Sequence, residues 1–389
     1  MKTMLVVPIA ILLFCGCPKK PPQQAELGEP LLGLSAADSA RFEAGKLVFE
    51  RVFTPEDGLG PLFNADACGE CHEDPLLGGV GDEIEVHASR FVEPDGCDPL
   101  FQEGGPVIQQ NATPLLQAVG IDGEQIPPSA TSQALRSTPP VFGFGLVDSI
   151  PEETILANED PEDADGDGIS GRVNRFIDGR VGRFGRKAFI PTLFEFNAGA
   201  FPIEQGVTTP FAPTEETING QPVPPGTDPA PDPEIQLADI EAATDFTRFL
   251  APPPRVFPKD FLERKQVEQG EKLFAKIDCA KCHVPAMQTG TSDIPALKYQ
   301  KVFLYSDLLL HDMGPDLADI CLGLATPAEF RTELLMGLRF RTQFLHDGRA
   351  KSVQDAIERH AGEAQAARDA FKNLSEEDQQ ALLKFLSTI

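Results

Sequence analysis

Positive charge is scarce in this chain, which has 33 lysine and arginine residues against 60 aspartate and glutamate residues. The resulting formal net charge of -27 would repel a nucleic-acid backbone, so we exclude DNA and RNA as partners. A field of this sign could attract a basic partner protein. It could equally be a solvated acidic surface that only keeps the protein in solution.

No hydrophobic run in the sequence is long enough to span a bilayer. The apolar stretch at residues 4–14 follows Lys2 and precedes Cys15-Gly-Cys17, which is the pattern of a secretory signal. We therefore expect residues 1–17 to be a signal peptide of the lipoprotein type, with Cys17 acylated. Ordinary cleavage and release, or an uncleaved anchor, are the alternatives. We expect an exported, periplasmic protein that contacts the outer membrane only through a lipid anchor.

Tryptophan is missing altogether, and histidine is limited to six residues. Two of the histidines end Cys-x-x-Cys-His motifs, which comprise Cys68, Cys71 and His72, and Cys279, Cys282 and His283. In such a motif two thiols can bond to the vinyl groups of a haem while the adjacent imidazole binds its iron. A zinc site or a thioredoxin-like pair does not need a histidine directly after the second cysteine, twice. We therefore predict two covalently attached c-type haems.

Two further cysteines, Cys97 and Cys321, belong neither to these motifs nor to the signal segment. In an oxidising compartment they could form a disulfide. They could also be two buried free thiols, because the sequence does not give the distance between them.

The hydrophobic pattern predicts a mainly α-helical protein with long loops and few strands. Residues 42–49 and 267–274 have apolar residues at helical spacing ahead of the two motifs and form a weak internal repeat. Residues 375–386 predict a C-terminal helix capped by Ser375. A small β-hairpin is expected at residues 173–184, around an Asp-Gly turn.

Proline-rich segments suggest how the chain is divided. Residues 18–36 are predicted to be a tether, and residues 206–236 a proline-rich linker. The linker would separate an N-terminal haem domain, residues 37–205, from a C-terminal one, residues 237–389.

The second axial ligand of each iron decides the function, because a second strong ligand favours an electron carrier and an open position can bind peroxide. The remaining candidates are four histidines and three methionines: His87, His311, His346, His360, Met287, Met313 and Met336. Lysine and tyrosine stay open as well.

Four segments resemble a bacterial di-haem oxidoreductase family of peroxidase-like and thiol oxidoreductase-like proteins. They are STPPVFG at 137–143, DADGDGISGR at 163–172, YSDLLLHDMG at 305–314 and FLHDGRA at 344–350. The resemblance extends from about residue 37 to the end, and the family is distantly similar to di-haem cytochrome c peroxidases. It implies two cytochrome c-like haem domains facing each other.

The resemblance also implies roles for individual residues. In the peroxidases, an iron ligand follows the HDG motif by fourteen residues, and His360 holds that position after His346. His87, fifteen residues after His72, corresponds to a histidine that caps the N-terminal haem. Either could instead be a surface residue, and His311 and Met313 remain rivals to His360. An acid for peroxide cleavage is needed near the first haem, and the candidates are Glu152 and Glu153.

The lack of tryptophan departs from the peroxidases, which place one between their haems. Arg186 stands where relatives often have an aromatic residue. We expect the two haems to be coupled through Tyr or Phe, by direct proximity, or only weakly.

Asp163, Asp165 and Asp167 occupy positions one, three and five of a calcium-type loop, with glycine at six and a carbonyl at seven. Position twelve is Asn174 instead of glutamate, so a ligand from elsewhere would be needed. The alternative is an Asp/Gly turn that binds nothing. A basic block follows the loop and could serve haem propionates or pair with the loop: Arg172, Arg175, Arg180, Arg183, Arg186 and Lys187.

The expected function is a peroxidase-like di-haem oxidoreductase, with substrate or peroxide chemistry at the N-terminal haem and electron transfer through the C-terminal haem. Its partner would be an electron donor or acceptor protein, such as a basic cytochrome or cupredoxin. A non-catalytic di-haem electron-transfer lipoprotein is the alternative. A metal-handling surface protein is a third possibility.

Overall fold

The computed structural model describes residues 24–93 and 96–389. The predicted signal peptide, residues 1–17, and the first part of the predicted tether, residues 18–23, lie outside the described residues. The rest of that tether packs onto the body, where Leu31 is buried and its backbone N–H donates to the Phe249 carbonyl at 2.8 Å. Within the described ranges, no helix is both long and apolar enough to cross a membrane.

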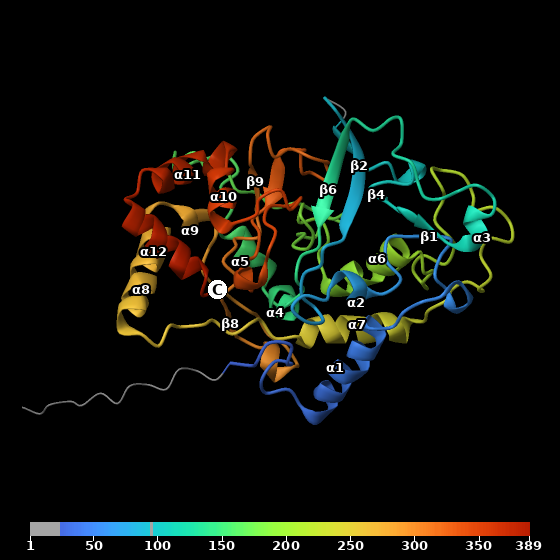
Figure 1. Cartoon of the computed structure of the whole chain (residues 1–389), viewed down its shortest axis with the longest axis horizontal. Coiled ribbons are helices and arrows are strands. Elements are labelled where there is room, and N and C mark those ends of the chain that lie inside the picture. The colour runs from blue at the N-terminus through green and yellow to red at the C-terminus, as the bar shows by residue number, and fades with distance from the viewer. Residues whose placement is uncertain (1–23, 94–95) are drawn as a thin grey trace, which may run out of the picture.

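Helices and short strands alternate along the described chain (Figure 1). The α-helices are α1 (Ala36–Phe49), α2 (Cys68–Cys71), α3 (Pro114–Gln117), α4 (Phe144–Asp148), α5 (Glu152–Leu156), α6 (Leu193–Gln205), α7 (Leu237–Phe249), α8 (Phe261–Lys276), α9 (Cys279–Cys282), α10 (Val353–Glu358), α11 (Gln365–Lys372) and α12 (Glu376–Leu386). The strands are β1 (Leu62–Phe63), β2 (Ile84–Val92), β3 (Gly96–Asp98), β4 (Val107–Ile108), β5 (Asn111–Ala112), β6 (Ser132–Ser137), β7 (Met287–Gln288), β8 (Lys301–Val302), β9 (Leu310–Asp312) and β10 (Glu329–Arg331).

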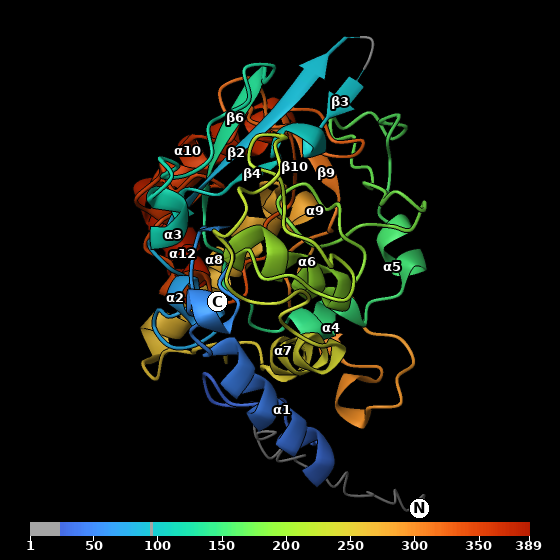
Figure 2. The same ribbon diagram turned by 90° about the vertical axis from the view of Figure 1, so that its right-hand side faces the viewer.

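The prediction of a mainly α-helical protein needs correction, since the fold mixes helices with several small sheets. The largest sheet has β2 paired antiparallel with β3, β4 and β6, and it rises above α1 and α7 (Figure 2). The hairpin expected at residues 173–184 is reduced to a tight turn with one antiparallel bridge between Arg175 and Val181. Phe184, at the end of this segment, forms its bridge with Ile190 instead of with the first arm of the turn.

The predicted internal repeat corresponds to two crossed helix pairs, α1 with α7 and α8 with α12. Gly45 of α1 and Gly270 of α8 lie at the crossings. A Cβ atom would stand 2.1 Å from the Ala242 carbonyl oxygen in the first pair and 2.0 Å from that of Ala381 in the second. Only glycine lets the backbones approach this closely, so the repeat encodes the same packing twice.

The predicted C-terminal helix is confirmed as α12. Ser375 caps it by accepting from the Asp378 backbone N–H at 3.2 Å, and acidic residues fill the first turn. Leu382 and Leu386 are buried on the face that packs against α8. The helix thereby closes the C-terminal apolar core.

Residues 206–236 do not form an isolated spacer. Val207 and Ile235, at its two ends, are buried in one apolar cluster with Phe201 of α6 and Ile240 of α7. Helix α7 follows this segment in sequence yet packs against α1 near the N-terminus. Helix α7 therefore packs with the N-terminal part of the chain, although it follows the predicted linker.

Cys97 and Cys321 form a disulfide between β3 and the C-terminal part of the chain, across 224 residues of sequence. Closing so long a loop restricts the unfolded chain strongly. Replacing both cysteines by serine should lower the free energy of unfolding by about 2–5 kcal/mol. Denaturant unfolding of oxidised protein would measure this, and adding a thiol reductant to the unmutated protein should have the same effect. An unchanged midpoint in both cases would contradict the bridge.

Candidate haem-binding sites

Each Cys-x-x-Cys-His motif is built as a single helical turn, α2 in the first case and α9 in the second. Residues three apart on a helix lie on the same side, so the paired thiols can reach one flat ligand together. All four cysteines are unbridged and half-buried. Burial raises the pKa of Cys68 and that of Cys279 to about 12, which keeps these thiols uncharged.

The two motif histidines are oriented in the same way. Nδ1 of His72 lies 3.2 Å from the Gly79 carbonyl oxygen, and Nδ1 of His283 lies 2.9 Å from that of Tyr305. A carbonyl can only accept, so each Nδ1 carries the proton and Nε2 keeps its lone pair for a metal. Burial lowers the pKa of His72 and lowers that of His283 to about 4, which keeps both rings neutral.

An aromatic ring from the preceding helix supports each motif histidine. The ring of Phe49 in α1 is 5.9 Å from that of His72, and the ring of Phe274 in α8 is 6.3 Å from that of His283. These are the ends of the repeated segments predicted from sequence. The repeat therefore supports both motif histidines in the same way.

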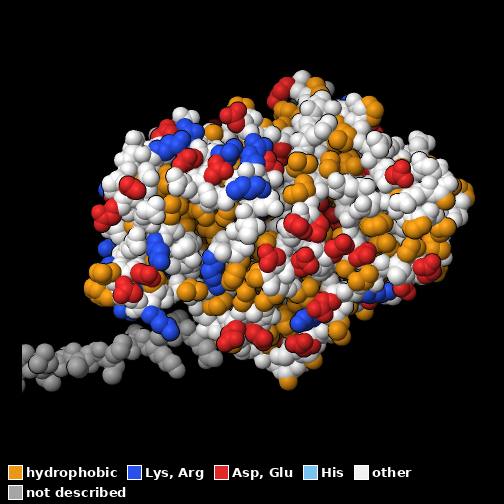
Figure 3. All heavy atoms as spheres, in the orientation of Figure 1, with side chains coloured by type: hydrophobic (Ala, Val, Ile, Leu, Met, Phe, Trp, Pro, Cys, Tyr) orange, Lys and Arg blue, Asp and Glu red, His pale blue; other side chains and the backbone are white. Residues whose placement is uncertain are grey.

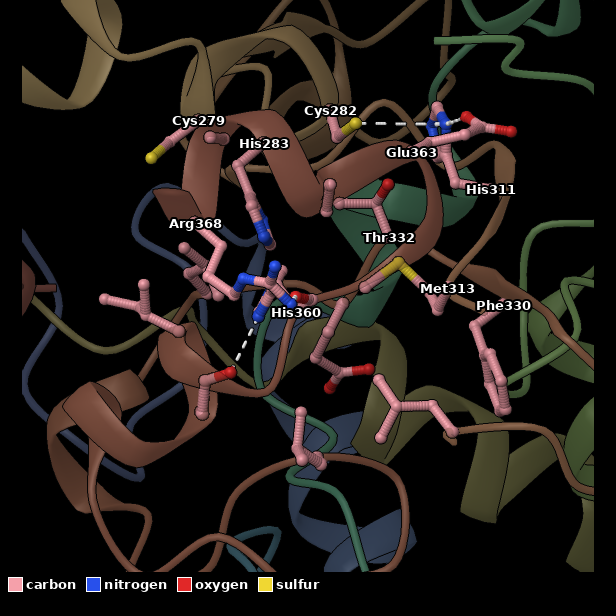
Figure 4. A pocket seen from close by; sticks show the side chains of 18 of the residues that line it. Cys279, Cys282, His283, His311, Met313, Phe330, Thr332, His360, Glu363 and Arg368 are labelled. Carbon is pink, nitrogen blue, oxygen red and sulfur yellow. Dashed lines mark hydrogen bonds and ion pairs between the residues drawn. The ribbon is translucent and has the colours of Figure 1, made fainter. Parts of the chain in front are cut away.

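A cavity of about 250 Å³ opens beside the second motif. Its walls are mainly apolar, and Cys279, Cys282 and His283 lie on them (Figure 4). His360, just after α10, enters the same space, and Figure 4 shows its ring and that of His283 directed toward each other. Thiols, a metal-ready imidazole and an apolar lining are the groups a c-type haem requires, so the residues fit this cofactor.

His360 has the tautomer that an iron ligand needs. Its Nδ1 donates to the Ala356 carbonyl at 2.7 Å, which leaves Nε2 as the free acceptor. Burial lowers the pKa of His360, so the ring is neutral. Among the methionine candidates, Met313 lines the cavity, whereas Met287 and Met336 are buried in the central apolar core.

His311 is occupied on both ring nitrogens. Nε2 lies 2.8 Å from Asp307 Oδ2, and Nδ1 lies 2.8 Å from Glu363 Oε2. Burial opposes a charge here, but the hydrogen bonds with Asp307, Cys282 and Glu363 raise the pKa of His311 to about 12. A doubly bonded imidazolium has no lone pair for iron, which removes His311 as a rival ligand.

His346 stacks on Phe330, with ring centroids 4.4 Å apart, and its Nε2 lies 3.5 Å from Asp319. Burial and the nearby charges of Arg136 and Arg186, among others, lower the pKa of His346 to about 2. His346 is therefore neutral and packed into the wall of the cavity beside the second motif.

His87 lies on β2, and its Nε2 is 2.9 Å from Glu85 Oε2. Burial opposes ionisation of Glu85, but the hydrogen bond with His87 lowers its pKa overall, and the Glu85 charge acts on Cys71 of the first motif. Glu85 therefore connects His87 electrostatically to the first motif. The sequence analysis missed Glu85, although its spacing of two from His87 places both on one strand face.

Glu204, near the end of α6, is a second carboxyl at the first motif. Its charge acts on Cys68 and Cys71, and its Oε2 accepts from Asn64 Nδ2 at 3.3 Å. Burial, and then the negative charge of Glu85, raise the pKa of Glu204 well above its ordinary value. No local pattern in the sequence points to Glu204, because it is brought here by the packing of α6.

The structure places the predicted acids elsewhere. Glu152 begins α5 and accepts from the Val181 backbone N–H at 3.3 Å, and Glu153 is exposed. Within the described chain, no hydrogen bond or ion pair joins either of them to the first motif. The carboxyls whose charges do act on Cys71 of this motif include Glu83, Glu204 and Glu85.

The calcium-type loop has its carboxylates arranged differently from the prediction. Oxygens of Asp160, Asp163 and Asp165 come within 4.8 Å of one another, whereas Asp167 pairs with Lys281 of the second motif. Asn174, at position twelve, is buried and donates to the Lys187 and Leu322 carbonyls. The Asp167–Lys281 ion pair thereby attaches the loop to the second motif. Asn174 is engaged with backbone carbonyls and is not available as a ligand for an ion in the loop.

Most of the basic block is engaged away from the cavity, as three ion pairs illustrate. Arg172 pairs with Glu329, Arg180 with Glu195 and Lys187 with Asp319. Of the six basic residues in the block, only Arg186 lines the cavity beside the second motif.

Comparisons with known proteins agree with a di-haem protein. The family model described as "Di-haem oxidoreductase, putative peroxidase" matches residues 130–389. No curated protein sequence matches the chain. Hydrazine synthase of Kuenenia stuttgartiensis has a TM-score of 0.42 at 15% identity, covering 100% of each chain.

Two other solved structures have similarly low scores. A variant of the diheme peroxidase BthA from Burkholderia thailandensis has a TM-score of 0.43 at 15% identity, covering 94% of this chain and 88% of that one. A MauG-like protein associated with microbial copper homeostasis has a TM-score of 0.31 at 16% identity, covering 62% and 89%. At these values the structural likeness assigns no residue and no activity.

Proposed function

Because this chain belongs to the di-haem oxidoreductase family, we propose that it is a c-type di-haem oxidoreductase with peroxidase-like activity. Substrate or peroxide chemistry would take place at the N-terminal site and electron transfer at the C-terminal site. The observation that carries this division is an asymmetry. Two similar proximal sites have different surroundings, with two carboxyls beside the first and a second metal-ready histidine in the cavity of the second.

Cys68, Cys71 and His72 would hold one haem, and Cys279, Cys282 and His283 the other, in two cytochrome c-like units. Bound haem supplies the one-electron redox chemistry that protein side chains lack. The chain contributes attachment, the tautomer of each proximal imidazole and the electrostatics around it. His360 would complete the coordination of the second iron.

Near the first haem, the chain would manage protons through Glu204 and Glu85. The pKa of Glu204 is raised and that of Glu85 is lowered, so Glu204 favours its protonated form and Glu85 its ionised form. The protonated Glu204 carboxyl could therefore act as an acid. Glu85, bonded to His87, can accept a proton.

We also propose an exported, lipid-anchored location and a basic electron-transfer partner, such as a cytochrome or cupredoxin. The sequence charge of -27 supports the partner class. Figure 3 shows acidic side chains spread over one face, with basic side chains mostly over the C-terminal part. We further propose that the carboxylates of Asp160, Asp163 and Asp165 bind a calcium ion.

A non-catalytic electron-transfer lipoprotein is the second candidate. His87 is hydrogen-bonded to Glu85, and the charge of Glu85 acts on Cys71 of the first motif. If His87 bound the first iron permanently, both haems would be six-coordinate and closed to peroxide.

The test is to purify the exported holoprotein and count its covalent haems by mass and haemochrome spectrum. We expect two, with Cys68→Ala/Cys71→Ala and Cys279→Ala/Cys282→Ala each losing one. Spectra of oxidised and half-reduced protein should show one high-spin iron, and peroxide should react with it. Two permanently low-spin haems that ignore peroxide would favour the second candidate, and absence of covalent haem would overturn both.

A further inference from the structure

Three arginines surround one glutamate in the wall of the cavity beside the second motif. Glu333 lies 2.7 Å from Arg186, 2.8 Å from Arg341 and 3.3 Å from Arg331. All four side chains line the cavity that also contains the Cys279 and His283 side chains. The three cations come from separate parts of the chain, and only the fold assembles them.

The arginines of this cluster are deeply buried. The side chains of Arg331 and Arg341 are 5% and 9% exposed, and that of Arg186 is 13% exposed. Nε of Arg341 is buried and makes no hydrogen bond within the described chain. A buried guanidinium N–H without an acceptor costs about 1–3 kcal/mol or more, which indicates that the group is meant to meet an anion.

The cluster has two more positive charges than negative ones. Burial opposes ionisation of Glu333, but Arg186, Arg341 and Arg331 together lower its pKa well below the ordinary value, so its single negative charge is secure. Two other buried carboxylates nearby are already paired. Asp307, whose charge also acts on Arg331, lies 2.8 Å from His311 Nε2. Asp319 lies 2.7 Å from Arg136 and 3.0 Å from Lys187, so neither carboxylate is left to neutralise the excess.

We propose that Arg186, Arg331 and Arg341 form the site that binds the two propionates of the C-terminal haem. This inference rests on the proposed function, since it presupposes a haem attached at Cys279 and Cys282. Two carboxylates supply the two negative charges that the cluster lacks, and a guanidinium fork matches carboxylate geometry. Glu333 holds the forks in position before the haem arrives.

The role has a measurable consequence for the haem. A propionate paired with arginine has its pKa lowered by about 1–3 units, so it stays ionised from pH 5 to 8 and the reduction potential changes little with pH. Removing its partner raises the propionate pKa into this range. Protonation at low pH then removes a negative charge near the iron and raises the potential there.

Other charged groups at this cavity must be kept constant. They are Asp167, Asp278, Lys281, His311, Glu363 and Arg368, with the neutral His346 in the wall. A single substitution in the cluster leaves all of them in place. The matched control is Arg172→Gln, which also breaks an arginine–glutamate pair, with Glu329 at 2.6 Å, but lies outside the cavity.

The experiment is spectroelectrochemistry of the holoprotein between pH 5 and 8. We expect Arg341→Gln to make the potential of the C-terminal haem depend on pH, with an apparent pKa raised by about 1–3 units. Arg341→Lys should restore most of the original behaviour, and Arg172→Gln should match the unmutated protein. If Arg341→Gln does not mature, Arg186→Gln gives the same test from the other side of Glu333.

The two failures are distinguishable. Two covalent haems, a low-spin C-terminal haem and superimposable pH curves for all variants would overturn the propionate site and leave the proposed function standing. Lack of a covalent haem at the second motif in the unmutated protein would overturn the proposed function, and this inference with it.

Discussion

Replacing Glu204 by glutamine should lower kcat/KM for peroxide by about 10²–10⁴-fold, while both covalent haems are retained. The pKa of Glu204 is raised by burial and by the charge of Glu85, which favours the protonated carboxyl that can deliver a proton. Glutamine keeps the size and the contact with Asn64 but has no acidic proton. Peroxide-dependent oxidation of a small electron donor would measure the change.

The pH dependence of kcat/KM for peroxide tests the same role of Glu204. A carboxyl with a raised pKa is protonated below that value and loses its proton above it, so the rate should fall as pH rises through the pKa of Glu204. This limb should vanish in Glu204→Gln. Glu153→Gln is the control, because Glu153 is exposed on α5 and should leave the rate unchanged. A normal rate in Glu204→Gln would show that another group supplies the proton.

Replacing His360 by methionine should raise the reduction potential of the C-terminal haem by on the order of 0.1 V, within the roughly 0.8 V range that axial ligands span. Nε2 of His360 is free to bind iron, and a thioether donates more weakly than imidazole to ferric iron. Potentiometric titration monitored by absorption would measure the shift. His360→Gly should in addition produce a high-spin signal from that haem.

Met313 provides the control, since it lines the same cavity as His360. Met313→Leu should leave the potential and the spin state of the C-terminal haem unchanged. If Met313→Leu produced the shift and His360→Met did not, the ligand would be Met313. The two variants therefore decide between the candidates that remain after His311 is excluded.

Local signals accounted for much of the fold's framework. Apolar spacing predicted the helical segments that lie in α1 and α8, and the cap at Ser375 with apolar spacing predicted α12. Both signals depend on residues close in sequence. The strand β2 was missed although Ile84, Val86 and Ala88 alternate with polar residues. Its partners β4 and β6 come from later segments, so the sheet is a non-local feature.

The candidate sites divide in the same way. His360 and His87 were predicted from spacing that the resemblance supplied, whereas Glu85 and Glu204 were not predicted. Helix α6 is far from the first motif in the sequence, and only packing brings Glu204 near Cys68 and Cys71. Glu85 is close in sequence, but the pairing of β2 in the sheet fixes its position. The predicted acids, Glu152 and Glu153, follow the Thr-Pro-Pro segment in the sequence, but no hydrogen bond or ion pair in the described chain joins them to the first motif.

The sequence by itself determined where two haems can attach, because thiol and imidazole groups within five consecutive residues need only one helical turn to be brought together. It also determined the acidic charge and the paired helix supports with Gly45 and Gly270. The tertiary structure alone decided which histidine keeps a free nitrogen, which carboxyl has a raised pKa and which arginines surround Glu333. Those properties depend on burial and on charges from distant segments, which no local pattern contains.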